Sequence, residues 1–222
     1  GVTSCARGDE VCALLAGGGY AEQVVVPSAQ VLPVPPGVSL VQAAALPEVF
    51  ATAYLNLFLE AGLVPGERAL LHAGASGVGT AGIQLCAAFG SPCYVTAGSD
   101  EKTARCLDLG AQGGCNRHRE NFADRVVEWT AGEGMDVILD PVGGGYLVDN
   151  LKSLRLEGRL VLIGLMGGTE ASIDLGLILA KRIKLVGSTL RTRPVAKKGE
   201  TMAALRERVW PLIATGSIKP IV

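Results

Sequence analysis

A glycine pattern at residues 77–82 is the part of the sequence with the clearest chemical use. It reads Gly77, Val78, Gly79, Thr80, Ala81, Gly82, a literal G-x-G-x-x-G. A tight turn after a strand needs glycine torsion angles, and a pyrophosphate must come close to bare backbone. The first N–H groups of the following helix then face the phosphates, and the helix dipole favours their negative charge. The pattern predicts a dinucleotide-binding turn.

The elements around this pattern provide the context that such a motif requires. Apolar runs at 69–73 and 93–97 predict two strands, and residues 78–89 between them predict a helix. The alternative is that the glycines only permit close packing of a helix on a sheet. That alternative does not explain why three glycines lie in the strand-to-helix turn.

The end of the second predicted strand bears on the choice of cofactor. NAD-binding sites usually carry Asp or Glu here, which binds the ribose 2′-hydroxyl. This sequence has Ala97, Gly98 and Ser99 instead, with no carboxylate to repel a 2′-phosphate. Polar and basic side chains that could bind such a phosphate follow, although each alone also fits a solvated surface group: Ser99, Lys102, Arg117 and Arg119. The nearby carboxylates of Asp100 and Glu101 disfavour a phosphate here, but the other features together predict NADP as the cofactor.

Two further predicted strands also end in glycine-rich turns, at residues 141–145 and 163–168. Ligands bind at the carboxyl edge of such sheets, and glycines there let the backbone approach the ribose and nicotinamide. Ordinary turn chemistry is the alternative reading of these two segments.

Alternating apolar strands and helices from residue 69 onward predict an α/β fold with a doubly wound parallel sheet, covered on both faces. We expect strands at 69–73, 93–97, 137–140, 159–165 and 183–188. We expect helices at 78–89, 101–109, 122–130, 146–154, 175–181 and 198–215.

Residues 1–47 differ from the rest of the chain. Short β-like runs at 9–15, 21–26 and 30–34 are separated by glycines and prolines, and the prolines favour edge strands. Ser39 and Gln42 form a capping-box pair that predicts a helix start. We expect residues 1–47 to be part of a small β domain, too short to bury a core alone, and residues 48–222 to form the nucleotide-binding domain.

Composition excludes several other classes of protein. The 222 residues carry a net charge of −1 and are 49% hydrophobic, so neither a nucleic-acid binder nor a disordered chain is expected. Residues 69–99 lack Asp, Glu, Lys and Arg, but glycines and Pro92 interrupt them, so we expect no membrane span. No secretory signal is visible at the N-terminus. The six cysteines are scattered without ligand spacing, which predicts reduced thiols, no metal and a cytoplasmic location.

Several segments together resemble the zeta-crystallin-like NADPH:quinone oxidoreductases, of the zinc-independent branch of the medium-chain dehydrogenase/reductase superfamily. The segments that carry the resemblance are 72–80 (HAGASGVGT), 95–99 (VTAGS), 109–111 (LGA) and 164–168 (GLMGG). Within this group, the segments most resemble the tumour-suppressor-induced quinone oxidoreductase type. The resemblance implies a GroES-like catalytic domain followed by a Rossmann domain. It also implies that relatives extend beyond both ends of this chain.

The resemblance implies a set of cofactor-binding residues for NADPH. Those expected at the pyrophosphate are Ala75, Ser76, Gly77 and Val78, and those at the 2′-phosphate are Gly98, Ser99, Lys102 and Arg117. Those expected at the ribose and nicotinamide are Val142, Gly144, Ile163, Gly164, Leu165 and Leu190. Zinc-dependent relatives place a cysteine ligand near the position of Glu48, which supports the absence of a metal site.

The activity implied is hydride transfer from NADPH to a quinone. A second reading is reduction of an enone or enoyl thioester, and a third is a non-catalytic NADPH-binding protein. A quinone accepts electrons without an obligatory protein acid, so no catalytic residue is assigned; Glu48 and Tyr54 are candidate cleft residues, and His72 is interpreted as structural. The β-prone segment 183–190 predicts a homodimer through a sheet edge, as the resemblance also implies.

Overall fold

The computed structural model describes residues 5–222, which fall into two compact units. One unit is Leu55–Ser188, and the other combines the residues up to Tyr54 with Thr189–Val222. These bounds differ from the expected division at residue 47, above all because the C-terminal residues belong with the N-terminal ones. The assignment of the N-terminal part to a GroES-like domain stays a prediction.

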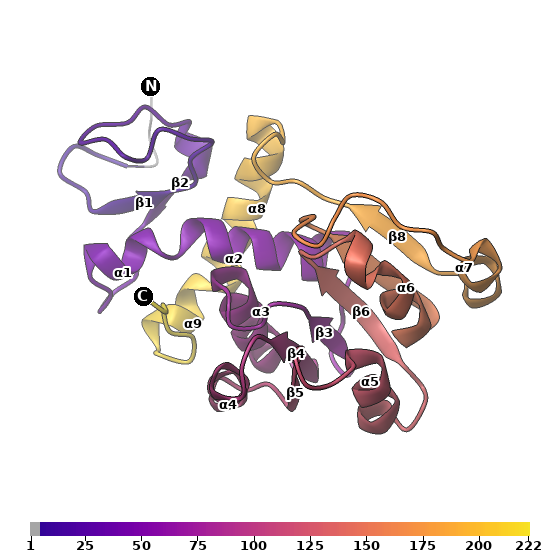
Figure 1. Cartoon of the computed structure of the whole chain (residues 1–222). Coiled ribbons are helices and arrows are strands. Elements are labelled where there is room, and N and C mark those ends of the chain that lie inside the picture. Colours follow the sequence, from indigo (N-terminus) through magenta and orange to yellow (C-terminus); the bar gives the residue numbers. More distant parts are fainter. Residues whose placement is uncertain (1–4) are drawn as a thin grey trace. The chain divides into compact units, whose positions relative to one another are not determined.

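The unit Leu55–Ser188 contains a parallel sheet with helices between its strands (Figure 1). Its first elements are η2 (a π-helical segment, Leu55–Glu60), β3 (Ala69–Leu71), α3 (Gly77–Ala88), β4 (Cys93–Ala97), α4 (Asp100–Asp108) and β5 (Gly113–Asn116). Its remaining elements are α5 (Phe122–Thr130), β6 (Met135–Asp140), α6 (Gly144–Ser153), β7 (Leu154–Leu162), α7 (Leu175–Lys181) and β8 (Lys184–Gly187). The strand order β5-β4-β3-β6-β7-β8, with every pair parallel, confirms the predicted doubly wound sheet.

Apolar side chains are buried on both faces of this sheet. Alternate residues of a strand point to opposite faces, so Leu70 and Leu71 enter different core clusters. The Leu71 cluster includes side chains from η2, α3 and α4, whereas the Leu70 cluster includes side chains from α5, α6 and α7. Burial on both faces explains why these strands read as continuous apolar runs.

Strand β5 is the strand of the parallel sheet that the sequence analysis misses. Its residues Gly113 and Gly114 have no strand-forming side chains, yet they pair with Tyr94 and Val95 of β4. A Cβ atom at Gly113 would lie 2.9 Å from the Tyr94 ring, and one at Gly114 would lie 2.6 Å from Thr103. Close packing therefore requires glycine here and removes the apolar pattern that predicts a strand.

The second unit has a two-stranded antiparallel sheet and several helices. Its elements are β1 (Val11–Ala13), η1 (Ser28–Gln30), β2 (Val31–Pro33), α1 (Leu40–Ala44), α2 (Pro47–Tyr54), α8 (Val195–Arg208) and α9 (Trp210–Ala214). The capping box of Ser39 and Gln42 at the start of α1 is confirmed. The strand expected at 21–26 is wrong, because this stretch is exposed and no described strand pairs with it.

Helix α8 packs on η1 and α2, which explains why the C-terminal residues join this unit. At the contact with η1 the two backbones lie close together, since a Cβ atom at Gly199 would lie 2.9 Å from the Ala29 side chain. The single helix expected at 198–215 is divided into α8 and α9 at Val209, just before Pro211.

The apolar stretch at residues 69–99 forms β3, α3 and β4 rather than one long helix. Among the described residues, no helix is both long and apolar enough to cross a membrane.

Gly79 tests the close approach of α3 to the preceding turn. A Cβ atom there would lie 2.5 Å from the carbonyl oxygens of Ala73 and Gly74. Helix propensity alone predicts that Gly79→Ala stabilises the protein by about 1 kcal/mol. We expect the clash with backbone to dominate, so that urea denaturation shows a loss of about 2 kcal/mol. Gly187→Ala, where nothing lies within 4 Å of the added Cβ atom, is the control; a stabilised Gly79→Ala protein would contradict the packing described.

Candidate functional site

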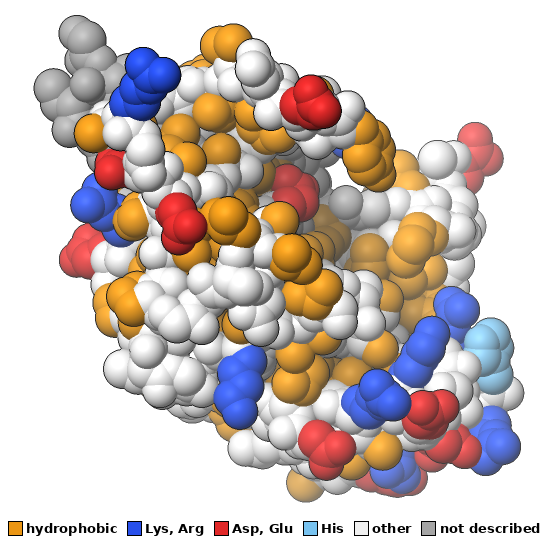
Figure 2. Space-filling model, turned by 90° about the vertical axis from the view of Figure 1, so that its left-hand side faces the viewer, with side chains coloured by type: hydrophobic (Ala, Val, Ile, Leu, Met, Phe, Trp, Pro, Cys, Tyr) orange, Lys and Arg blue, Asp and Glu red, His pale blue; other side chains and the backbone are white. Residues whose placement is uncertain are grey.

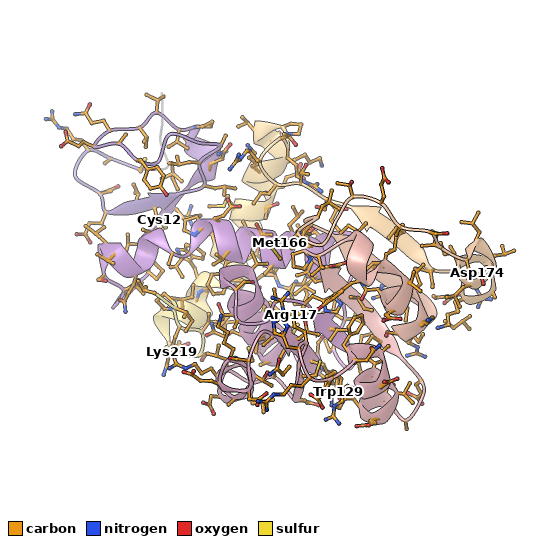
Figure 3. The ribbon with its side chains drawn as sticks, viewed as in Figure 1. Cys12, Arg117, Trp129, Met166, Asp174 and Lys219 are labelled. Atoms are coloured by element: carbon orange, nitrogen blue, oxygen red, sulfur yellow. The ribbon has the colours of Figure 1, made fainter. Side chains whose placement is uncertain are left out.

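A pocket of about 540 Å³ opens at the carboxyl ends of the parallel strands. Its lining residues come from the end of β4 and from the segments that follow β3, β4, β5, β6 and β7: Ala73, Ala75, Ser76, Thr96, Ala97, Gly98, Lys102, Arg117, Val142, Tyr146, Met166 and Gly167. Figure 3 labels two of them, Arg117 after β5 and Met166 after β7. This is the edge of a doubly wound sheet at which ligands bind.

The turn between β3 and α3 forms one part of the pocket. Gly74 donates its N–H to the Thr96 carbonyl (2.9 Å), and a Cβ atom there would lie 2.6 Å from Val95. Ser76 caps α3 by accepting the Gly79 N–H at its hydroxyl (3.1 Å). Gly77 and Val78 hold the first helical positions, whose N–H groups have no partner within the helix. Such a helix start is suited to binding a phosphate.

Two cations line the pocket beside the end of β4. Lys102 lies in the first turn of α4, and Arg117 follows β5. Gly98 lies next to them, since a Cβ atom at that position would be 3.8 Å from Arg117 Nε. Among the described residues, no ion pair involves either cation. Both charges are therefore available to an anionic ligand.

The two acidic residues that argue against a phosphate have other partners. Asp100 forms an ion pair with Arg119 and accepts a hydrogen bond from the Asn116 amide (2.7 Å). Glu101 pairs with Arg105 one helical turn along α4 (3.3 Å). Figure 2 shows Lys and Arg side chains gathered near a histidine on one face, with Asp and Glu among them. The carboxylates nearest the cations in sequence are thus paired with other basic groups.

The structure places the predicted site residues in three groups. Those that line the pocket are Ala75, Ser76, Gly98, Lys102, Arg117 and Val142. Gly77 and Val78 begin α3, while Ser99 caps α4 by accepting the Lys102 N–H (3.2 Å), so these three shape the pocket's edge. Their roles toward a cofactor stay predictions.

The remaining predicted residues do not line this pocket. Gly144 lies against the 167–170 turn and donates its N–H to Gly168 (2.9 Å). Ile163 packs on the core, Gly164 lies against the Pro141 carbonyl, and Leu165 is half exposed. Leu190 is buried in the other unit. Their predicted contacts with ribose and nicotinamide are untested.

Several lining residues were not among the sequence candidates: Ala73, Thr96, Ala97, Tyr146, Met166 and Gly167. Thr96 and Ala97 end β4, so the rule about strand ends could have identified them. No local signal marks Tyr146, which reaches the pocket from α6. It packs against His72 and Phe122, with ring centroids 4.7 and 4.9 Å apart.

His72, interpreted above as structural, is buried beneath the pocket. Its Nε2 lies 2.7 Å from Asn150 Oδ1 and its Nδ1 lies 3.1 Å from Thr96 Oγ1. Burial disfavours the charged ring and lowers the pKa of His72 to about 4. The imidazole is therefore neutral at pH 7.

The cysteines and the candidate cleft residues contribute little reactive chemistry. All six cysteines are unpaired, and burial raises the pKa of Cys12 and of Cys115 to about 11. Within residues 5–222 no three His, Cys, Asp or Glu side chains gather as metal ligands do. Tyr54 is buried and accepts a hydrogen bond from Arg208, while Glu48 lines a separate hollow of about 600 Å³.

The low pKa of His72 predicts a pH-dependent stability. The unfolded chain binds a proton with a pKa near 6.5 but the folded protein only near 4, so the stabilisation is present above pH 6.5 and is lost as pH falls toward 4. Urea denaturation should show a loss of about 2 kcal/mol between pH 7 and pH 5 from this residue. Burial raises the pKa of Asp140, an effect of opposite sign.

The matched variants for this experiment are His72→Asn and His118→Gln. His72→Asn should show a smaller slope between pH 7 and pH 5, whereas His118→Gln, which replaces an exposed side chain, should keep the slope of the unmodified protein. Equal slopes for all three proteins would contradict the neutral buried ring.

Comparison with known proteins places these features in a family. Residues 77–207 match the family model described as zinc-binding dehydrogenase. The chain is 35% identical to quinone oxidoreductase-like protein 2 of Rattus norvegicus over 84% of this chain and 53% of the relative. The chain thus spans about half the length of the curated relatives it matches.

Solved structures agree with this assignment. The quinone oxidoreductase of Thermus thermophilus, solved also with NADPH, superposes with a TM-score of 0.82 at 32% identity, covering 95% of this chain and 66% of that one. The CurK enoyl reductase superposes with a TM-score of 0.73 at 30% identity, covering 89% and 58%. The chain belongs to the zinc-binding dehydrogenase family, and its similarity to quinone oxidoreductase-like proteins supports the expected place in the medium-chain dehydrogenase/reductase superfamily.

Proposed function

We propose that this chain binds NADPH in the pocket at the strand ends, as part of an enzyme that reduces a quinone. The observation that carries the proposal is the combination of a free helix N-terminus at α3 with two cations, Lys102 and Arg117, in one pocket. The pyrophosphate would bind at the helix start, and the 2′-phosphate would bind beside the cations. A bound nicotinamide supplies the hydride, and the chain's own task is to hold and orient it.

The residues present fit this cofactor. Gly98 places no side chain beside Lys102 and Arg117, so no carboxylate stands at this position of the pocket. Tyr146 lines the same pocket as Arg117. Apolar groups of Val142 and Met166 line another part of the same pocket and would exclude water from a flat ring.

Reduction of an enone or enoyl thioester is the second candidate. The similarity to the CurK enoyl reductase is the observation that favours it. A non-catalytic NADPH-binding role is the third reading. All three readings need the same dinucleotide, so turnover of the acceptor is the property that separates them.

The choice of acceptor is tested by turnover. We expect this chain, joined to the additional segments that its longer relatives carry, to oxidise NADPH with a simple ortho- or para-quinone, and this chain alone to be weak or inactive. The panel includes alkenones and enoyl thioesters, and NADPH oxidation is followed by absorbance. Turnover of enones without turnover of quinones supports the second candidate, and no turnover of either supports the third.

The choice of cofactor is tested by binding. A charge-assisted hydrogen bond to a phosphate is worth about 1.5–3 kcal/mol before solvent and salt reduce it. We therefore expect fluorescence titration to show NADPH binding at least about tenfold tighter than NADH, with a smaller difference at high salt. Lys102→Glu should remove most of this preference by weakening NADPH alone.

The control for this variant is Lys152→Glu, which makes the same charge change on α6, away from the pocket. It should leave both affinities unchanged. Equal affinities for NADPH and NADH in the unmodified protein would overturn the proposed 2′-phosphate site.

We propose a homodimer formed through β8. This strand lies at one edge of the sheet, with one backbone side unpaired by the sheet itself. Exposed Leu175 and Leu179 of α7 and Leu185 of β8 add apolar surface beside it. Light scattering at micromolar concentration should give the mass of a dimer, and a monomer mass would contradict this interface.

The unpaired, mostly buried thiols suit the reducing cytoplasm, which we propose as the protein's location.

A further inference from the structure

Four buried side chains form one hydrogen-bond network beneath the pocket. Thr96 Oγ1 lies 3.1 Å from His72 Nδ1, and His72 Nε2 lies 2.7 Å from Asn150 Oδ1. Asn150 Nδ2 donates to Asp140 Oδ2 at 2.9 Å. At most 2% of any of these four residues is exposed. The chain of bonds therefore links the ends of β4, β3 and β6 through α6.

Which group donates and which accepts in each hydrogen bond of this network follows from the bonds at Asp140. The Asp140 carboxylate accepts the N–H groups of Val142 and Gly143, so Asn150 must present its amide nitrogen to it. The amide oxygen of Asn150, which only accepts, then faces His72. His72 must therefore carry its proton on Nε2.

The same reasoning applies to the other end of the network, at Thr96. Nδ1 of the neutral His72 ring has no proton, so it accepts the hydroxyl proton of Thr96. The Thr96 oxygen is then free to accept the N–H of Ala73, which lies 3.4 Å away. Each group thus donates in one direction, from the Ala73 backbone to Asp140.

The surroundings of His72 keep its ring neutral. The rings of Phe122 and Tyr146 pack edge-on against it, with centroids 4.6 and 4.7 Å away. Burial raises the pKa of the Tyr146 phenol, so that group is uncharged at pH 7 as well. The carboxylate of Asp140 reaches His72 only through Asn150.

The two ends of this hydrogen-bond network contact the backbone on two sides of the pocket. At one end, Ala73 has a φ of 55°, a left-handed conformation that is strained for a residue with a side chain. Its N–H points to Thr96, and the turn that it begins leads to the helix start of α3. At the other end, Asp140 fixes the backbone that carries Val142.

We propose that His72 is a positioning residue of the pocket. Its Nε2-protonated ring joins the Thr96–Ala73 side to the Asn150–Asp140 side and fixes the two sides at the separation that the cofactor needs. The identity of that cofactor rests on the proposed function above.

The first experiment reads the proton position directly. The chain has two histidines, and His118→Gln identifies the ¹⁵N ring signals of His72. We expect a protonated Nε2 and an unprotonated Nδ1 at pH 7. A proton on Nδ1, or a charged ring at that pH, would overturn the proposal.

The second experiment separates the two bonds of the ring. An asparagine places its amide oxygen near the position of ring Nδ1, whereas a glutamine places its amide nitrogen near that of Nε2. His72→Asn should therefore keep the Thr96 bond, and His72→Gln should keep only the Asn150 bond. Each variant breaks one of the two bonds, so we expect both to weaken NADPH binding roughly tenfold, whereas only His72→Gln should speed amide exchange at Ala73.

Thr96→Val tests the same link without altering the histidine. It removes the hydroxyl but keeps the branched shape, so we expect it to match His72→Gln in NADPH affinity and in Ala73 exchange. The double variant Thr96→Val/His72→Gln should lose little more NADPH affinity than either single variant, because both changes break the same Thr96–His72 hydrogen bond. Unchanged affinity and exchange in Thr96→Val, or unchanged NADPH affinity in His72→Asn, would overturn the proposal.

These outcomes are distinct from failure of the proposed function. If the unmodified chain does not bind NADPH, the cofactor assignment fails. The His72 proton position and the Ala73 exchange rates of the three variants still decide the role of His72.

Discussion

Parallel pairing of β3 with both β4 and β6 is the constraint on which the functional part depends. Leu71 lies opposite Val95 on one side and opposite Leu139 on the other. This register brings the three strand ends to one edge, where their turns form the pocket. A slip of one residue would exchange the side chains between the two faces and disrupt the packing of both cores.

Buried polar groups add a second requirement at that edge. An unsatisfied polar group inside a protein costs about 1–3 kcal/mol, so His72, Asn150 and Asp140 are tolerated there because each is hydrogen-bonded. Apolar packing accepts many small rearrangements, whereas this set of bonds accepts only one arrangement of donors and acceptors. The pocket thus has a rigid base, above which the start of α3 and the two cations meet the solvent. The proposed binding of a phosphate-rich cofactor uses both parts.

Much of this arrangement could be predicted from the sequence because its signals are local. The turn from β3 to α3 and the capping box at Ser39 depend on residues within a few positions of one another. Strand β5 could not be found, because Gly113 and Gly114 are present for contacts with Tyr94 and Thr103. Tyr146 reaches the pocket from α6, far in sequence from the turn after β3, and only the fold brings the two together. The place of residues 189–222 beside the N-terminal residues likewise depends on contacts with η1 and α2 that no local pattern shows.

The measurement that tests the central claim most directly is amide chemical-shift mapping of this chain during titration with NADPH. The account predicts that the amides of Gly77, Val78 and Gly98 shift most, because they begin α3 or lie beside the two cations. With NADH the shifts at Gly77 and Val78 should remain, while those at Gly98 and Lys102 should shrink. Shifts confined to the residues up to Tyr54, or none at the start of α3, would contradict the account.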